Sequence, residues 1–161
     1  MDRRMVIMGV ALAGPLTAAA AAQSGLENPL LAAFAKTLSA HDIDGFAALF
    51  ADNYVNHQMS AAAPKPAPGI SAKQATVGFF AARLKGIPDL SVAIEASLAS
   101  GDMAAASFLY TGTHRGEYFG VAPTGKSLRF TSCDIFRIRD GQIAEHWGMG
   151  DIAGTLAQLR G

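Results

Sequence analysis

The strongest constraint on the fold is a regular alternation of apolar and polar residues through the second half of the chain. Residues 90–98 carry apolar side chains at every second position, which predicts a strand with one buried face. Residues 103–115 form another such segment, and residues 130–150 contain two long strands around Asp140-Gly141. An Asp-Gly pair suits a two-residue hairpin turn. The sequence therefore predicts four consecutive strands that pair as antiparallel neighbours.

Helical patterns occupy the chain before these strands. Leu30, Phe34 and Leu38 recur every four residues, so we expect an amphipathic helix over about residues 29–40. Asp42 is a suitable N-cap for a second, short helix. Both helices would present an apolar face to a core.

A short strand, a loop and a third helix follow. Residues 54–57 are typical of a strand, and the prolines of residues 59–70 exclude a regular helix or central strand there. We interpret residues 59–70 as a plain surface loop or as a lid over a pocket. Ser71 and Gln74 match a capping box, so the third helix begins there and ends at Gly86.

Helices that precede a run of antiparallel strands give an α+β fold. We expect one curved antiparallel sheet wrapped against three N-terminal helices, so that the domain forms a cone with an inner cavity. A last short helix over residues 152–159 would follow Asp151 as its N-cap. No internal repeat or second domain is evident, so residues 23–161 are predicted to form one domain.

Residues 1–22 have the pattern of an export signal peptide. Arg3 and Arg4 precede an apolar run at residues 5–12, and the alanines at 20–22 offer a cleavage site. The alternative is an apolar N-terminal helix that stays on the protein. The arginine pair leaves the general and the twin-arginine export routes both open. We therefore predict an exported protein, periplasmic or secreted, with no membrane attachment after signal cleavage.

The composition of the chain limits the partners, metals and cross-links that can be expected. The formal net charge is zero and no basic stripe is present, which argues against nucleic acid. After the N-terminal segment, no apolar run reaches the roughly 20 residues of a membrane-spanning helix. The four histidines lack metal-ligand spacing, so no metal site is expected. Cys133 is the only cysteine, so no internal disulfide forms, and we expect it to pack on the face opposite Asp134.

Three polar side chains stand out on strand faces that are otherwise apolar. Alternation puts Ser132 and Asp134 on one face of the first hairpin strand, and His146 on one face of the second. A carboxylate and an imidazole among apolar neighbours can form a buried acid/base pair. We predict Asp134 and His146 as a catalytic pair. The alternative is a structural role, with Asp134 bonded to His146 or to Arg115.

Four segments of the chain carry a further pattern in their order and spacing. They are Tyr54-Val55-Asn56-His57, Gly112 through Glu117, Gly120 through Lys126, and Phe136 through Trp147. Together they resemble the SnoaL-like polyketide and ester cyclases of the nuclear transport factor 2-like superfamily. The resemblance extends from about residue 30 to residue 160. It implies the cone fold, an intramolecular aldol condensation on a polyketide methyl ester, and no metal or organic cofactor.

The resemblance also implies roles for individual residues. In these cyclases a carboxylate abstracts a proton alpha to a carbonyl, and polar neighbours hold the enolate. The family's early-strand asparagine matches Asn56, and its pocket histidine or glutamine falls at Asp134. Its catalytic aspartate falls at Gly148, so the usual base is missing. We expect substrate contacts from five further side chains: Tyr54, Asn56, His57, His114 and Ser132.

The missing carboxylate leaves three interpretations. Asp134 could replace the base, His146 could be the base with Asp134 orienting it, or the cavity could bind a small apolar molecule without chemistry. Export weakens the cyclase interpretation, because polyketide assembly is cytoplasmic. We favour proton abstraction from a small, largely apolar carbonyl compound, leading to aldol-type cyclisation or isomerisation. A non-catalytic exported binding protein is the alternative.

A further alternative is an enzyme like the limonene epoxide hydrolases, which share the fold and the Tyr-x-Asn pattern of Tyr54 and Asn56. Those enzymes need an Asp-Arg-Asp arrangement around an attacking water. Arg115 and Glu117 could supply two members, but the third again falls at Gly148.

Trp147 alternates away from His146, which puts it on the outer face of the predicted sheet. The resemblance implies that this face forms a homodimer interface, where a large aromatic side chain is commonly buried. We therefore predict a homodimer through the outer face of the sheet.

Overall fold

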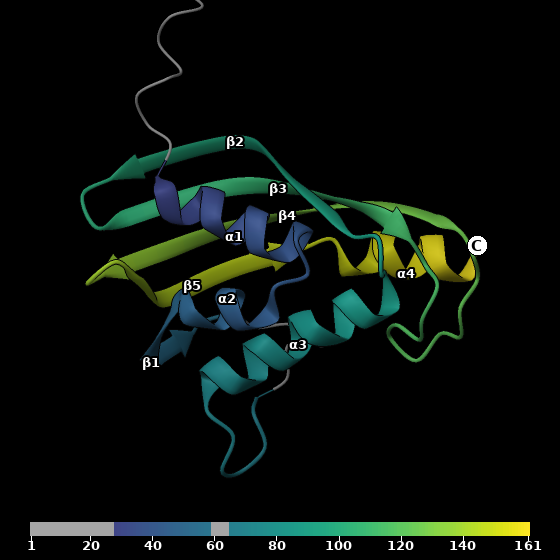
Figure 1. Cartoon of the computed structure of the whole chain (residues 1–161), viewed down its shortest axis with the longest axis horizontal. Helices are drawn as coiled ribbons and strands as arrows, with labels where there is room; N and C mark the ends of the chain where they lie inside the picture. Colours follow the sequence, from purple (N-terminus) through teal and green to yellow (C-terminus); the bar gives the residue numbers. More distant parts are fainter. Residues whose placement is uncertain (1–27, 59–64) are drawn as a thin grey trace, which may run out of the picture.

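The computed structural model describes residues 28–58 and 65–161, so the predicted export signal and part of the 59–70 loop lie outside the described residues. The element order is the predicted one: two helices, a short strand, a third helix, four strands and a terminal helix (Figure 1). Among the described helices, none is long and apolar enough to cross a membrane. The elements are α1 (Pro29–Ser39), α2 (Ile43–Ala48), β1 (Phe50–Asn56), α3 (Ala72–Gly86), β2 (Ser91–Ser100), β3 (Met103–Thr113), β4 (Ser127–Arg139), β5 (Gln142–Gly150) and α4 (Ile152–Arg160).

The predicted helix starts are confirmed by their side-chain caps. The carboxylate of Asp42 accepts a hydrogen bond from the Gly45 backbone N–H at 2.8 Å, and Asp151 caps α4 in the same way. Ser71 and Gln74 form the complete capping box of α3. Each cap satisfies backbone donors that the first turn of a helix leaves open.

The five strands form one curved sheet in the order β1-β5-β4-β3-β2. β2 to β5 pair antiparallel as predicted, and Asp140 and Gly141 have the positive φ angles, 51° and 75°, of a primed hairpin turn. The edge strand differs from the prediction. It begins at Phe50 and pairs parallel with β5, so the sheet is antiparallel except at this edge. A parallel pair needs a long crossover connection, which local alternation does not reveal.

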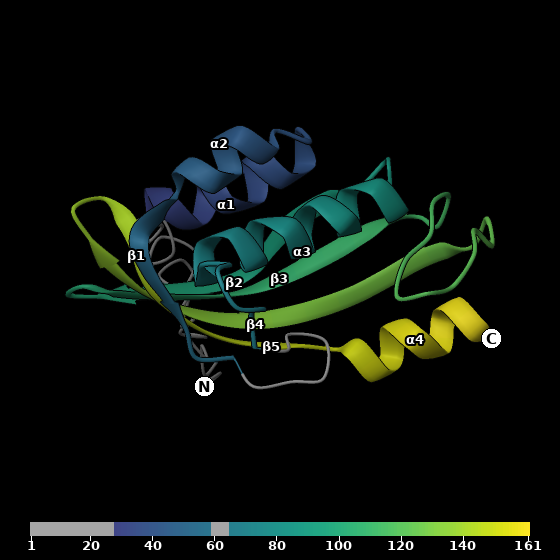
Figure 2. The ribbon, with the colours of Figure 1, turned by 90° about the horizontal axis from the view of Figure 1, so that it is seen from below.

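The core lies between the concave face of the sheet and the helices that cover it. Figure 2 shows α1, α2 and α3 on the same side of the sheet, as predicted for an α+β cone. Phe34 of α1 is 1% exposed and stands at the centre of this core. Its ring centroid lies 4.8–5.6 Å from those of Phe46, Phe80, Phe108 and Phe136. These four rings come from two helices and two strands, so Phe34 packs the helices against the sheet.

The outer face of the sheet carries several exposed apolar side chains. Leu98, Ile135 and Met149 are 60%, 44% and 78% exposed. Trp147 lies on this face as predicted and is half-buried, and Cys133 is exposed there, opposite Asp134. The homodimer contact expected on this face stays a prediction.

Asp89 ties the turn before β2 to the end of β3. Its carboxylate accepts hydrogen bonds from the Thr113 backbone N–H at 2.7 Å and from the Thr113 hydroxyl at 2.8 Å. These hydrogen bonds hold the pKa of Asp89 below its ordinary value of 3.8. A lowered pKa stabilises the folded state above the unfolded-state pKa, and this contribution is lost as the pH falls through the folded-state pKa.

We therefore expect Asp89→Ala to melt roughly 2–4 °C below the wild type at pH 7, the effect of about one hydrogen bond in a domain of this size. The difference should shrink below about pH 4 and disappear near the folded-state pKa. Thermal melts between neutral and acidic pH measure it, with the exposed Glu117→Ala as control. A difference that stays constant with pH would contradict the assigned role of the carboxylate.

Candidate active site

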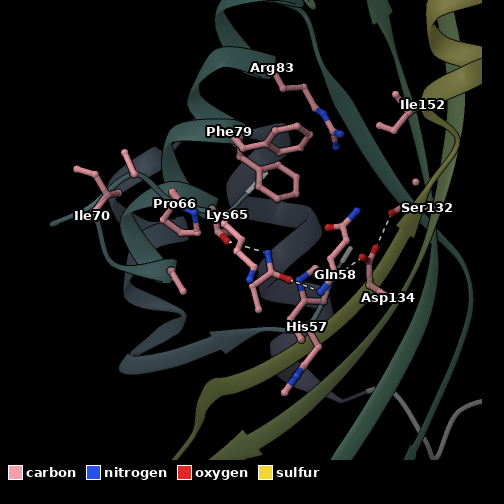
Figure 3. A pocket seen from close by; sticks show the side chains of 18 of the residues that line it. His57, Gln58, Lys65, Pro66, Ile70, Phe79, Arg83, Ser132, Asp134 and Ile152 are labelled. Carbon is pink, nitrogen blue, oxygen red and sulfur yellow. Dashed lines mark hydrogen bonds and ion pairs between the residues drawn. The ribbon is translucent and has the colours of Figure 1, made fainter. Parts of the chain in front are cut away.

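A cavity of about 660 Å³ lies between α3 and the concave face of the sheet, bordered by the described part of the 59–70 loop. Figure 3 shows Ser132 and Asp134 from β4 on one side and Phe79 and Arg83 from α3 on the other. Mostly apolar walls with a few convergent polar groups are typical of a small-molecule site. The lining includes Asn56, Thr76, Phe79, Phe80, Arg83, Tyr110, Ser132, Asp134, His146 and Ile152.

Asp134 and His146 meet inside this cavity. His146 Nε2 lies 2.7 Å from Asp134 Oδ1, and the residues are 4% and 7% exposed, respectively. The strand register explains the contact. Asp134 is opposite Gly148, and His146 is opposite Phe136, so the two side chains approach diagonally across β4 and β5. The distance lies within the reach of about 2.6–3.2 Å that proton transfer requires.

Further hydrogen bonds hold both members of the pair. Ser132 Oγ lies 2.5 Å from Asp134 Oδ2, and the Tyr54 hydroxyl lies 3.1 Å from His146 Nδ1. An ionised Asp134 accepts from Ser132 and from the Nε2–H of His146, which leaves Nδ1 to accept from Tyr54. Burial raises the pKa of Tyr54, so its hydroxyl keeps the proton that it donates. A neutral His146 beside a carboxylate therefore satisfies each of these hydrogen bonds.

Three of the predicted substrate contacts belong to this site. Asn56 lines the cavity, and its amide donates to Thr76 Oγ1 at 3.4 Å. Thr76 in turn donates to the Tyr54 hydroxyl at 3.4 Å. Ser132 lines the cavity beside Asp134, whereas Tyr54 lies behind the wall and supports His146. Asn56 and Ser132 thus face the cavity and Tyr54 supports His146, and contact with a substrate stays a prediction.

The side chains of His57 and His114 are not brought to the acid/base pair. His57 borders the cavity, but its ring stacks on Trp147 at 4.5 Å and its Nε2 lies 2.9 Å from Glu145 on the outer face. His114 is fully buried outside the cavity lining, where its Nδ1 accepts from the Thr124 backbone N–H at 3.2 Å. Neither ring is hydrogen-bonded to Asp134 or His146, and the predicted substrate contacts of both residues stay predictions. His57 and His114 directly follow the ends of β1 and β3, so strand alternation does not predict which way their side chains point.

Sequence reasoning did not identify Arg83, which is 5% exposed at the cavity wall. Its Nε donates to the Tyr118 hydroxyl at 2.9 Å. Burial acts to lower the pKa of Arg83, but the Tyr118 and Tyr110 hydroxyls and Asp134 outweigh it and the net shift is upward. A sequence signal existed, because Thr76, Phe80 and Arg83 are spaced four and three apart and share a helical face.

Comparison with known protein families identifies the chain. The sequence model of the SnoaL-like polyketide cyclase family matches residues 29–159, which is most of the described structure. The chain belongs to the SnoaL-like polyketide cyclase family. The resemblance inferred from the four sequence segments is therefore confirmed. No curated protein matches the sequence.

Solved structures of similar fold include several proteins described as putative polyketide cyclases. IdmH from Streptomyces antibioticus, described as a putative polyketide cyclase, is 27% identical with a TM-score of 0.70, over 83% of this chain and 97% of that chain. AclR from Streptomyces galilaeus, described as a putative hydroxylase, is 24% identical with a TM-score of 0.71, over 82% of this chain and 79% of that chain. A protein from Catenulispora acidiphila with a ketosteroid isomerase-like fold is 21% identical with a TM-score of 0.61, over 81% of this chain and 92% of that chain.

Gly148 stands at the position where the resemblance implies a catalytic aspartate. A Cβ atom at Gly148 would lie 2.5 Å from Asp134 Oδ1 and 2.5 Å from His146 Nε2. Such approaches are closer than van der Waals contact allows. The hydrogen bond between Asp134 and His146 therefore occupies the space that a side chain at position 148 would need.

The arrangement required for an epoxide hydrolase does not form from the residues considered for it. Arg115 and Glu117 are exposed and do not line the cavity. The described residues also contain no group of three or more His, Cys, Asp or Glu side chains that could hold a metal ion.

Proposed function

We propose that this protein removes a proton from the carbon alpha to the carbonyl of a small, largely apolar compound held in its cavity. Asp134 is the base, and His146 positions it. The observation that carries the proposal is the 2.7 Å contact between these two buried side chains inside a cavity of about 660 Å³. Enolate formation of this kind would start an aldol-type cyclisation or an isomerisation, in keeping with the SnoaL-like family.

The hydrogen bonds favour Asp134 over His146 as the proton acceptor. Both ring nitrogens of His146 already have partners, Asp134 at Nε2 and Tyr54 at Nδ1. Each oxygen of Asp134 has one donor and keeps a further lone pair that can face a substrate. Asp134 is 7% exposed, so an apolar ligand that fills the cavity would exclude water from the carboxylate and favour its reaction with a carbon acid.

Deuterium exchange into 2-tetralone, an apolar ketone with acidic C–H bonds, tests the proposal. We expect the wild type to accelerate exchange at the alpha carbon in D₂O, measured by NMR. Asp134→Asn keeps the shape of the side chain and one of its two acceptor oxygens but removes the base, so the enzymatic rate should fall by about 10²–10⁴-fold. The matched control is Asp140→Asn, which changes an exposed carboxylate at a hairpin turn.

The competing function is ligand binding without chemistry, by a protein that is predicted to be exported. Gly148 favours it, since the position where the resemblance implies a catalytic aspartate has no side chain. Exchange that is no faster with the wild type than in buffer would remove the proton-abstraction proposal and leave this alternative. Equal exchange rates for the wild type and Asp134→Asn would show that another group is the base.

A further inference from the structure

Arg83 is a buried cation at the wall of the cavity. None of the ion pairs among the described residues includes it. Its guanidinium carbon lies 4.7–5.2 Å from the ring centroids of Phe79, Phe80, Tyr110 and Phe130. These aromatic faces stabilise the positive charge and keep water away from it. A buried charge usually needs a partner of opposite sign, and among the described residues Arg83 contacts these ring faces and the Tyr118 hydroxyl but no carboxylate within ion-pair distance.

The hydrogen-bond donors of Arg83 are incompletely used. A guanidinium has five N–H groups, and the described residues accept from only one of its nitrogens, Nε, through the Tyr118 hydroxyl. The Tyr110 hydroxyl lies near the guanidinium, but the two terminal amino groups make no hydrogen bond of ordinary geometry with the described residues. Figure 3 shows the guanidinium directed from α3 into the space that Ser132 and Asp134 face. These paired terminal groups form the fork that binds a carboxylate with two parallel hydrogen bonds.

The charges around the cavity also favour an anion. Among the described residues, its lining contains two cationic side chains, Lys65 and Arg83, and one carboxylate, Asp134. Asp134 is hydrogen-bonded to Ser132 and to Nε2 of His146, and its charge acts on Arg83 only at a distance, without an ion pair. With a neutral His146, a ligand carrying one negative charge balances the site.

We infer that the ligand of this cavity carries a carboxylate, bound by the terminal nitrogens of Arg83, while its carbonyl-bearing part extends toward Asp134. The inference deepens the proposed function, because it names the substrate class for the same cavity: an apolar, carbonyl-containing acid. A guanidinium surrounded by aromatic rings discriminates strongly between an anion and a neutral group of the same shape, because little water competes for its donors.

Calorimetric titration with 2-naphthoate and 2-naphthamide at pH 7 tests the inference, because the two probes share ring and shape and differ in charge. We expect the wild type to bind 2-naphthoate about 10–100-fold more tightly. Arg83→Met keeps much of the apolar stem and should abolish this preference without weakening 2-naphthamide binding. Arg83→Lys keeps the charge without the fork and should retain part of the preference. Arg129→Met removes an exposed cation outside the lining and should change nothing.

Three outcomes would overturn the inference: a wild type that binds neither probe, one that binds both equally, or an Arg83→Met variant that keeps the preference. The comparison of two probes on the wild type and on Arg83→Lys stands even if Arg83→Met fails to fold. Asp134→Asn should keep or strengthen 2-naphthoate binding, because it removes a like charge. The exchange test uses 2-tetralone, which has no carboxylate, so failure of the base and failure of the Arg83 site are distinguishable.

Discussion

Gly148→Ala should be as inactive in proton exchange as Asp134→Asn, a loss of at least about 10²-fold. The new Cβ would lie 2.5 Å from Asp134 Oδ1 and from His146 Nε2, so the two side chains must separate. Asp134 and His146 would then be buried without the hydrogen bond that compensates for their loss of water. Overpacking of this kind also costs about 1–3 kcal/mol of folding free energy.

The matched control is Gly78→Ala, because a Cβ at Gly78 meets no atom within 4 Å and the residue lies outside the cavity lining. This variant should keep full exchange activity and gain up to about 1 kcal/mol of stability, since alanine is the better helix former. NMR exchange rates and urea unfolding measure both effects. If the Gly148→Ala variant folds and exchanges protons at the wild-type rate, the Asp134–His146 contact is not needed for the reaction.

Phe34→Ala should destabilise the fold by about 3–5 kcal/mol, the usual cost of truncating a fully buried phenylalanine. Phe34 is 1% exposed and contacts aromatic rings from two helices and two strands, so the cavity left behind has rigid walls on several sides. Walls that cannot collapse make the loss larger than the transfer free energy of the side chain alone.

Urea unfolding of Phe34→Ala and Phe34→Leu measures this effect, and the leucine variant should lose clearly less because it refills much of the space. Ile70→Ala serves as control, since Ile70 is 48% exposed. A loss below about 1 kcal/mol for Phe34→Ala would mean that the helices and the sheet are not joined through this residue.

Local sequence patterns were sufficient to predict most of the fold. The caps at Asp42, Ser71 and Asp151 are decided by residues three positions apart, and each forms as predicted. Alternation fixed the faces of β4 and β5 correctly, since side-chain direction follows directly from strand periodicity. The parallel pairing of β1 with β5 was missed, because it depends on segments far apart in the sequence.

The difference between local patterns and contacts distant in sequence also explains which site residues were predicted and which were missed. Asp134 and His146 lie on adjacent hairpin strands, so register alone brings them together. Arg83 approaches from α3, and no strand or helix pattern shows which part of the sheet a helix will cover. His57 and His114 follow the ends of regular pairing, and their rings are fixed by Trp147 and Thr124. Those contacts are tertiary and have no local signal.

The parallel edge of the sheet has a consequence for the order in which the molecule assembles. Tyr54 and His146 are separated by 92 residues, so their contact closes a loop that spans most of the domain. Contacts of such high sequence separation form late, because the entropy of loop closure must be overcome first. A nascent chain that lacks β5 has Asn56 and Tyr54 but no strand to hold them. The site therefore appears only with the final segments of the chain.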